Sequence, residues 1–192
     1  MMVEHHRRID SDQKMEPKKV ELEDETGEER AKRVWKMADC VCFDVDSTVC
    51  RDEAIDELAN FLGVGEAVSK ATKAAMNGNT RFREALRSRL NVMKPSKEQI
   101  EKFKIENPPK LTPGIDKLIS SLHNHSIPVY LVSGGFRSLI EPVADCLKIS
   151  RTKIYANVLL FNEDGSYSGF DENELTSDSG SKEVKEKKCL MF

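Results

Sequence analysis

Two short apolar runs in the middle of the chain have the pattern of buried strands. The run 40–45 is rich in Val, Cys and Phe, and the run 127–135, "IPVYLVSGG", ends in a glycine turn. Apolar residues recur at helical spacing after each run. Two strand–turn–helix units of this kind predict an α/β fold with a Rossmann-like parallel sheet. Residues 154–170 add two expected short strands about an Asp-Gly turn.

A long helical pattern separates the two strands. From about 53 to 106 the apolar residues recur at i, i+3 and i+4, which predicts a helical cap inserted after the first strand. The prolines of "NPPKLTPG" (107–114) end this pattern, and a new helix is expected to be capped by Thr112-Pro113. The expected divisions are a disordered N-terminal extension 1–26, a lead-in helix and first core strand 27–52, a helical cap 53–110, the remainder of the core 111–180, and a divergent C-terminal tail 181–192.

Composition narrows the class of partner. The net charge is −3 with 33% charged residues, so no large basic excess points to nucleic acid. No apolar run reaches the roughly 18–20 residues that a membrane span needs, and the first 30 residues contain no apolar segment typical of a secretory signal. The five scattered cysteines form no C-x-x-C pair, which is typical of reduced thiols. A cytoplasmic location is therefore expected.

The candidate chemistry lies at the ends of the two buried strands. Asp44 and Asp46 follow the first strand at i and i+2, so in an extended segment both carboxylates face one site. One carboxylate can attack a phosphoryl group and the other can shuttle a proton, while a divalent metal neutralises the phosphate. Ser133 offers a hydroxyl at the end of the second strand, and Gly134-Gly135 allow backbone N–H groups to approach an anion.

Two other interpretations of the paired acids stay open at this point. A D-x-D pattern is also found in metal-free acidic loops and in the metal motif of sugar-nucleotide transferases. The combination of D-x-D-S-T after one strand with S-G-G-F-R after a later strand is much more specific than D-x-D alone.

Five segments together carry a resemblance to a known family: "CFDVDSTV", "AMNGNTRFREALRSRL", "LTPGI", "LVSGGFRS" and "YSGFDE". From about Lys32 to Lys182 the chain resembles the phosphoserine phosphatases of the haloacid dehalogenase-like superfamily. The resemblance implies hydrolysis of L-phosphoserine to L-serine and phosphate through an aspartyl-phosphate, the last step of serine biosynthesis. It also implies Mg2+ as cofactor and a small-molecule substrate.

The resemblance also implies a role for each matching residue. Asp44 would be the nucleophile and Asp46 the acid/base, and both would bind Mg2+. Glu53 would take the substrate ammonium and Arg89 its carboxylate, although the residue pattern alone favours a solvated helix face for these two. The implied substrate-binding residues are Glu53, Met76, Phe82, Arg89, Ser133, Gly134 and Lys182.

The C-terminal segment departs from the family pattern. Ser181 and Glu183 replace glycines on either side of Lys182, and the family's G-D-G-x-x-D loop, which supplies a further metal-binding aspartate, is missing. We therefore expect a truncated or splice-variant form that binds Mg2+ weakly and leaves the strand 40–45 as an open sheet edge. A catalytically inactive remnant that binds a ligand or partner is the alternative.

Three further expectations concern assembly and the chain's local chemistry. The chain is expected to form a homodimer or to pair with a full-length relative.

The terminal "CLMF" has the Cys-a-a-X form of a prenylation site at Cys189, but an accidental tail is the favoured interpretation. Pro142 falls inside an expected helix, where proline costs roughly 3 kcal/mol.

Overall fold

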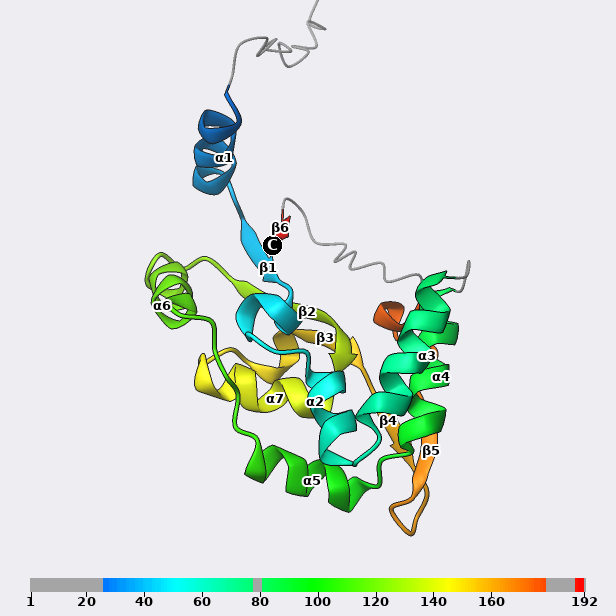
Figure 1. The fold of residues 1–192 in the computed structure, drawn as a ribbon. Helices are drawn as coiled ribbons and strands as arrows, with labels where there is room; N and C mark the ends of the chain where they lie inside the picture. The colour runs from blue at the N-terminus through cyan, green and yellow to red at the C-terminus, as the bar shows by residue number, and fades with distance from the viewer. Residues whose placement is uncertain (1–25, 78–80, 179–188, 192) are drawn as a thin grey trace, which may run out of the picture.

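A four-stranded parallel sheet forms the centre of the computed structural model, which describes residues 26–77, 81–178 and 189–191 (Figure 1). The strands lie in the order β3-β2-β1-β6. Their bounds are β1 Cys40–Phe43, β2 Val129–Phe136, β3 Ile154–Asn157 and β6 Cys189–Met191. The α/β fold and the Rossmann-like parallel sheet expected from the sequence are confirmed.

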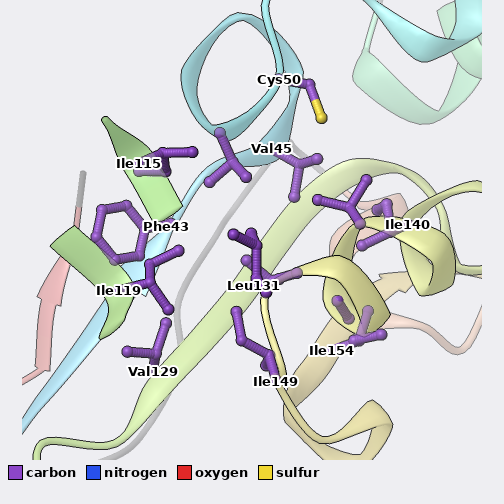
Figure 2. Close-up of a cluster of buried hydrophobic side chains, with 14 of the residues drawn as sticks. Phe43, Val45, Cys50, Ile115, Ile119, Val129, Leu131, Ile140, Ile149 and Ile154 are labelled. Atoms are coloured by element: carbon purple, nitrogen blue, oxygen red, sulfur yellow. The ribbon is translucent and has the colours of Figure 1, made fainter. Parts of the chain in front are cut away.

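The larger hydrophobic core joins this sheet to two helices, α6 Ile115–Asn124 and α7 Arg137–Cys146 (Figure 2). All residues of β1 are buried, as the continuous apolar run predicted, because both faces of an inner parallel strand are covered. Val41 pairs with Val129, which sets β1 and β2 in register with their carboxyl ends at the same edge. The candidate residues that follow β1 and end β2 lie at this edge of the sheet.

Four helices follow β1 and enclose a second hydrophobic core. They are α2 Ala54–Phe61, α3 Gly65–Asn77, α4 Phe82–Met93 and α5 Lys97–Glu106. The predicted helical pattern of this segment is confirmed, and the domain boundaries drawn around it stay predictions. The second core also includes Phe136 and Leu139 from the sheet region and Phe170 from a later strand, so the helical segment is packed onto the rest of the molecule.

The two strands expected about the Asp-Gly turn are present, but the apolar run before the turn does not form one continuous strand. The first apolar run is divided: β3 joins the parallel sheet, whereas β4 Leu159–Phe161 pairs antiparallel with β5 Tyr167–Phe170. The division falls at Val158, directly after Asn157, whose buried side-chain amide donates to the Gly134 carbonyl at 2.7 Å. That bond ties the end of β3 to the end of β2.

The expectation of an open edge at β1 is wrong. The tail segment β6 pairs in parallel with β1, with Cys40 opposite Cys189 and Cys42 opposite Met191. An unpaired strand presents a row of free backbone donors and acceptors, and a short apolar segment of the same chain satisfies them here. The expectation of reduced thiols needs one correction as well: Cys40 is disulfide-bonded, whereas Cys42, Cys50 and Cys146 keep their thiol groups.

The remaining elements follow local sequence signals. The lead-in helix α1 Gly27–Lys36 begins at a capping box formed by Thr26 and Glu29, as helix-start chemistry favours. Helix α6 starts after Gly114, which has a φ of 86°, so the cap is this glycine and not Thr112-Pro113. Pro142 does lie inside α7, and the helix continues through it. Within the described part of the chain, no helix has the length and apolarity needed to cross a membrane.

Candidate active site

A cleft of about 290 Å3 lies where the carboxyl ends of β1 and β2 meet the helical segment. It combines acidic, basic, apolar and glycine positions from four separate parts of the chain. The residues that line it are Asp44, Asp46, Glu53, Ile55, Phe82, Arg89, Gly134, Gly135 and Thr176.

The turn after β1 delivers the two aspartates. Asp44 and Asp46 both have extended backbone angles, which keeps the i and i+2 side chains on the same side, as the sequence indicated. Ser47 then reverses the chain with a φ of 57°, and its hydroxyl donates to the Glu53 carboxylate at 2.5 Å. The turn therefore places three carboxylates around one cleft.

Asp46 is held by two hydrogen bonds that fix its orientation. The Ala54 N–H donates to its Oδ1 at 2.9 Å, and the Ser133 hydroxyl donates to its Oδ2 at 3.2 Å. The pKa of Asp46 is nevertheless raised, first by burial and then by the charges of Glu53 and Asp44, although both hydrogen bonds act in the opposite direction. A carboxyl with a raised pKa is suited to give and take a proton.

Side chains crowd the two glycines at the end of β2. A Cβ on Gly134 would lie 2.8 Å from the Phe82 ring, and a Cβ on Gly135 would lie 3.0 Å from Asp46 Oδ2. Ser133 is fully buried, and its Oγ accepts a hydrogen bond from the Gly135 N–H at 2.8 Å. Ser133 therefore lies behind the cleft, between the glycine loop and Asp46.

Arg89 brings a positive charge into the cleft from helix α4. Its Nε is buried and has no hydrogen-bond partner within residues 26–77, 81–178 and 189–191. Burial lowers the pKa of the guanidinium, and the nearby acids Asp56, Glu53 and Asp46 act against that shift. A buried donor without a partner is costly, so this group is arranged for an acceptor that enters the cleft.

The structure brings together most of the residues proposed from the sequence. Asp44, Asp46, Glu53, Phe82, Arg89 and Gly134 line the cleft, and Ser133 lies directly behind it. Met76 belongs to α3, but its side chain is outside the described set, and Lys182 lies outside the described residues altogether.

Sequence reasoning missed two polar residues of the site. Thr176 lines the cleft, and its hydroxyl donates to the buried Asn157 amide oxygen at 2.9 Å. Asn157 in turn donates to the Gly134 carbonyl. The signal available in the sequence was an Asn in the middle of an apolar run, "IYANVLLF", where a polar residue needs buried partners.

The two aspartates supply carboxylate oxygens, which are the type of ligand that Mg2+ prefers. This ion takes oxygen ligands, keeps several waters, and is commonly held by one or two carboxylates together with substrate phosphate. Asp44 and Asp46 supply two such carboxylates in one cleft. No group of three or more His, Cys, Asp or Glu side chains among the described residues is placed to hold a metal.

Comparison with known proteins agrees with this geometry. Residues 38–165 match the family model of the haloacid dehalogenase-like hydrolases. The chloroplastic phosphoserine phosphatase of Arabidopsis thaliana is 53% identical over 149 residues, which cover 78% of this chain and 50% of the relative. The phosphoserine phosphatase of Bos taurus is 52% identical over 151 residues, which cover 79% of this chain and 67% of the relative.

The fold of this chain is also similar to that of a solved structure. The phospho-aspartyl intermediate analogue of a phosphoserine phosphatase superposes with a TM-score of 0.58 at 34% identity, over 69% of this chain and 61% of that one. The chain spans about half the length of the Arabidopsis relative and about two thirds of the bovine one. The chain belongs to the haloacid dehalogenase-like hydrolase family, and its relatives there are phosphoserine phosphatases.

Proposed function

We propose that this chain hydrolyses L-phosphoserine to L-serine and phosphate. The observation that carries the proposal is the cleft itself, where Asp44 and Asp46 lie with a glycine loop and with Arg89, whose buried Nε has no hydrogen-bond partner among the described residues. The names of the relatives support the same substrate, since each is a phosphoserine phosphatase.

The reaction would proceed in two halves. In the first, an Asp44 carboxylate oxygen attacks phosphorus, the bond from phosphorus to the serine oxygen breaks, and Asp46 gives its proton to that oxygen. In the second, Asp46 takes a proton from water, the water oxygen attacks phosphorus, and the bond to Asp44 breaks. Both halves need Asp46 within reach of the same oxygen position, which its bonds to Ala54 N–H and Ser133 favour.

Substrate selection would depend on the charges above the phosphate position. Arg89 would bind the substrate carboxylate and Glu53 its ammonium, because a zwitterion needs one cation and one anion at fixed places. The Phe82 ring lies so close to Gly134 that a side chain there would displace the ring, and it would close the phosphate end of the cleft.

Mg2+ is the cofactor that fits the acidic pair. When bound at Asp44 and Asp46, the ion would neutralise phosphate charge that otherwise repels an anionic nucleophile. By family resemblance, Lys182 is a further candidate for binding the phosphate. The cytoplasmic location of the protein stays a prediction.

The non-catalytic alternative draws on one observation. Among the described residues no third acidic, His or Cys side chain joins Asp44 and Asp46 in a group that could hold a metal. A chain that binds phosphoserine without turning it over would have the same cleft, so activity is the deciding measurement.

The test is release of phosphate from L-phosphoserine by the purified 192-residue chain with Mg2+. Asp44→Asn serves as the inactive reference, with a loss of at least about a thousandfold in kcat expected. Phosphoethanolamine, which lacks the carboxylate, is expected to be a poor substrate. Release no faster than that of Asp44→Asn would overturn the proposal, and thermal stabilisation by phosphoserine under those conditions would support the binding alternative.

A further inference from the structure

A buried amide lies directly beneath the glycine loop of the cleft. The side chain of Asn157, at the end of β3, is fully buried. Its Nδ2 donates to the Gly134 carbonyl at 2.7 Å, and its Oδ1 accepts from the Thr176 hydroxyl at 2.9 Å. Both ends of the amide are therefore engaged, one by the loop and one by the wall of the cleft.

The peptide between Gly134 and Gly135 is held from both sides. Asn157 binds its carbonyl, and the Ser133 hydroxyl accepts from its N–H at 2.8 Å. Glycines have no side chain to anchor them, and their backbone is the least restricted of any residue. These two hydrogen bonds therefore determine which way the peptide plane faces.

The same chain of contacts reaches the helical segment. Thr176 belongs to the 3-10 turn Leu175–Ser177. Arg83 of α4 donates to the Ser177 carbonyl at 3.3 Å, to the Ser177 hydroxyl at 3.2 Å and to the Glu172 carbonyl at 3.1 Å. The turn that carries Thr176 is thus fastened to the helix that carries Arg89.

We propose that Asn157 is a positioning residue that fixes the Gly134–Gly135 peptide, and with it the shape of the glycine loop, at the phosphate end of the cleft, with Thr176 holding the Asn157 amide in place. The proposal rests on the proposed function, because it concerns the same phosphate position. Asn157 acts through the loop and contacts no reacting atom.

A positioning role of Asn157 and a packing role predict different effects of its removal. Removal of the Asn157 amide leaves the Gly134 carbonyl without its donor, and the peptide plane is then held only through Ser133. A packing role would affect stability alone. A positioning role also changes how tightly the loop binds an anion, in the fraction of protein that remains folded.

The experiment measures inorganic phosphate binding, which needs no turnover. The amide resonances of Gly134 and Gly135 are followed during a titration of the full chain with inorganic phosphate in the presence of Mg2+. The test variants are Asn157→Ala, Thr176→Val and Thr176→Ser. The matched controls are Asn162→Ala on the exposed hairpin and Thr152→Val in an exposed turn.

Asn157→Ala is expected to weaken phosphate binding by about tenfold, the effect of one lost hydrogen bond. It should also shift the free Gly135 amide resonance. Thr176→Val should act in the same direction by about threefold, and Thr176→Ser should restore the wild-type value because it keeps the hydroxyl. The two controls should bind phosphate like the wild type. Thr176→Val is close to isosteric, so it gives the answer if Asn157→Ala does not fold.

Two results would overturn the positioning role: folded variants that bind phosphate like the wild type, or a Thr176→Ser variant that behaves like Thr176→Val. Failure of the proposed function has a different signature. A wild-type chain that binds inorganic phosphate at Gly134 and Gly135 but releases none from phosphoserine would refute hydrolysis, and the effect of Asn157 on binding would still be measured.

Discussion

Burial acts against the negative charge of Asp46. The pKa of this carboxyl is raised from 3.8, chiefly because the side chain is withdrawn from water and secondly because Glu53 and Asp44 are near. An acid whose pKa is higher in the folded state lowers the stability of the fold as the pH rises above the unfolded-state pKa, and the loss is complete above the folded-state pKa. In the absence of metal, Asp46 thus costs stability at neutral pH, and this cost is what a bound cation would offset.

Asp46→Asn is therefore expected to stabilise the metal-free protein. In EDTA at pH 7 the Tm should rise by about 2–4 °C, the shift that roughly 1 kcal/mol produces in a chain of this size. The gain should shrink as the pH is lowered toward 3.8 and vanish below it, because the wild-type carboxyl is then neutral in both the folded and the unfolded state. Mg2+ should raise the Tm of the wild type and not that of the variant. Thermal denaturation with and without Mg2+ measures all three effects.

Asp164→Asn is the matched control for this substitution. The pKa of Asp164 is lowered by hydrogen bonds from the side chain and the N–H of Ser166, the opposite direction from Asp46. Its exchange should bring no gain in Tm in EDTA, and it should leave the Mg2+ effect intact. A metal-free Asp46→Asn protein that melts below the wild type would show that the negative charge is favourable there.

The second prediction for a single residue concerns Arg89. Its buried Nε has no partner in the described structure, so we expect it to donate to the substrate carboxylate. Arg89→Met should raise the KM for phosphoserine by about 10–100-fold, the loss expected for a charge-assisted hydrogen bond. Inhibition by inorganic phosphate should be unchanged, since phosphate lacks the carboxylate. Steady-state kinetics with both ligands separates these effects.

Arg87→Met is the control on the same helix. Arg87 is more exposed, binds Glu172 at 2.6 Å and lies 5.9 Å from the centre of the Phe170 ring. Its loss should leave KM within about threefold, because exposed ion pairs contribute little. Equal changes in KM for the two variants would contradict a specific carboxylate site at Arg89.

The acids and the buried amide also show how far residues can be assigned from sequence. Asp44 and Asp46 were predictable because alternation along an extended segment is a local rule that the turn obeys. Asn157 and Thr176 were not, because their partners lie 23 and 19 positions away in the chain. Only the pairing of β3 with β2 brings them under the cleft.

At the scale of elements, one arginine fastens α4 to the segment after β5. Arg83 donates to backbone and side-chain oxygens of Glu172 and Ser177 and lies 3.8 Å from Asp178. These contacts are long-range, and they join a helix of the inserted segment to the wall of the cleft. The orientation of α4 over the cleft therefore depends on Arg83.

Arg83→Gln should loosen this attachment without unfolding the core. We expect a Tm lower by about 2–4 °C and faster amide hydrogen exchange in residues 172–178, while the sheet strands keep their protection. Arg81→Gln, which changes an exposed arginine just before the same helix, should leave exchange unchanged. Uniformly faster exchange over β1 and β2 in Arg83→Gln would instead point to global destabilisation.

Element types were easier to predict than element partners. The helices from α2 to α5 follow from apolar spacing alone, since each buries one face in the second core. The run "IYANVLLF" carries no Gly or Pro that would announce two strands. Its division at Val158 comes from tertiary structure: β3 pairs with β2 at one edge of the parallel sheet, whereas β4 pairs with β5.

At the scale of the whole molecule, the sheet edge is the feature that sequence reasoning misjudged. The departure of the tail from the family pattern suggested an open β1, but pairing depends on which segment can reach the edge and not on family likeness. Three residues, Cys189–Met191, take the place beside β1. A short edge strand limits the backbone that is left open to another chain.

Proline substitutions test what this strand contributes. In a parallel pair the N–H groups of successive residues point to opposite sides, so either Leu190 or Met191 donates to β1. One of the variants Leu190→Pro and Met191→Pro should therefore lose a ladder hydrogen bond, lower the Tm by about 2–4 °C and increase light scattering on heating. Lys185→Pro places the same residue outside β6 and is the control.

Comparison of melting and light scattering among the three proline variants shows whether β6 protects the sheet edge. If β6 protects the edge, the proline that removes a ladder donor should aggregate more than its neighbour, and both should differ from Lys185→Pro. A concentration-dependent rise in scattering is expected as well, because an exposed β1 edge would pair with a second molecule. If all three variants melt and scatter alike, the tail segment contributes nothing to the sheet, and β1 must be stable as an edge through the burial of Val41 and Phe43 alone.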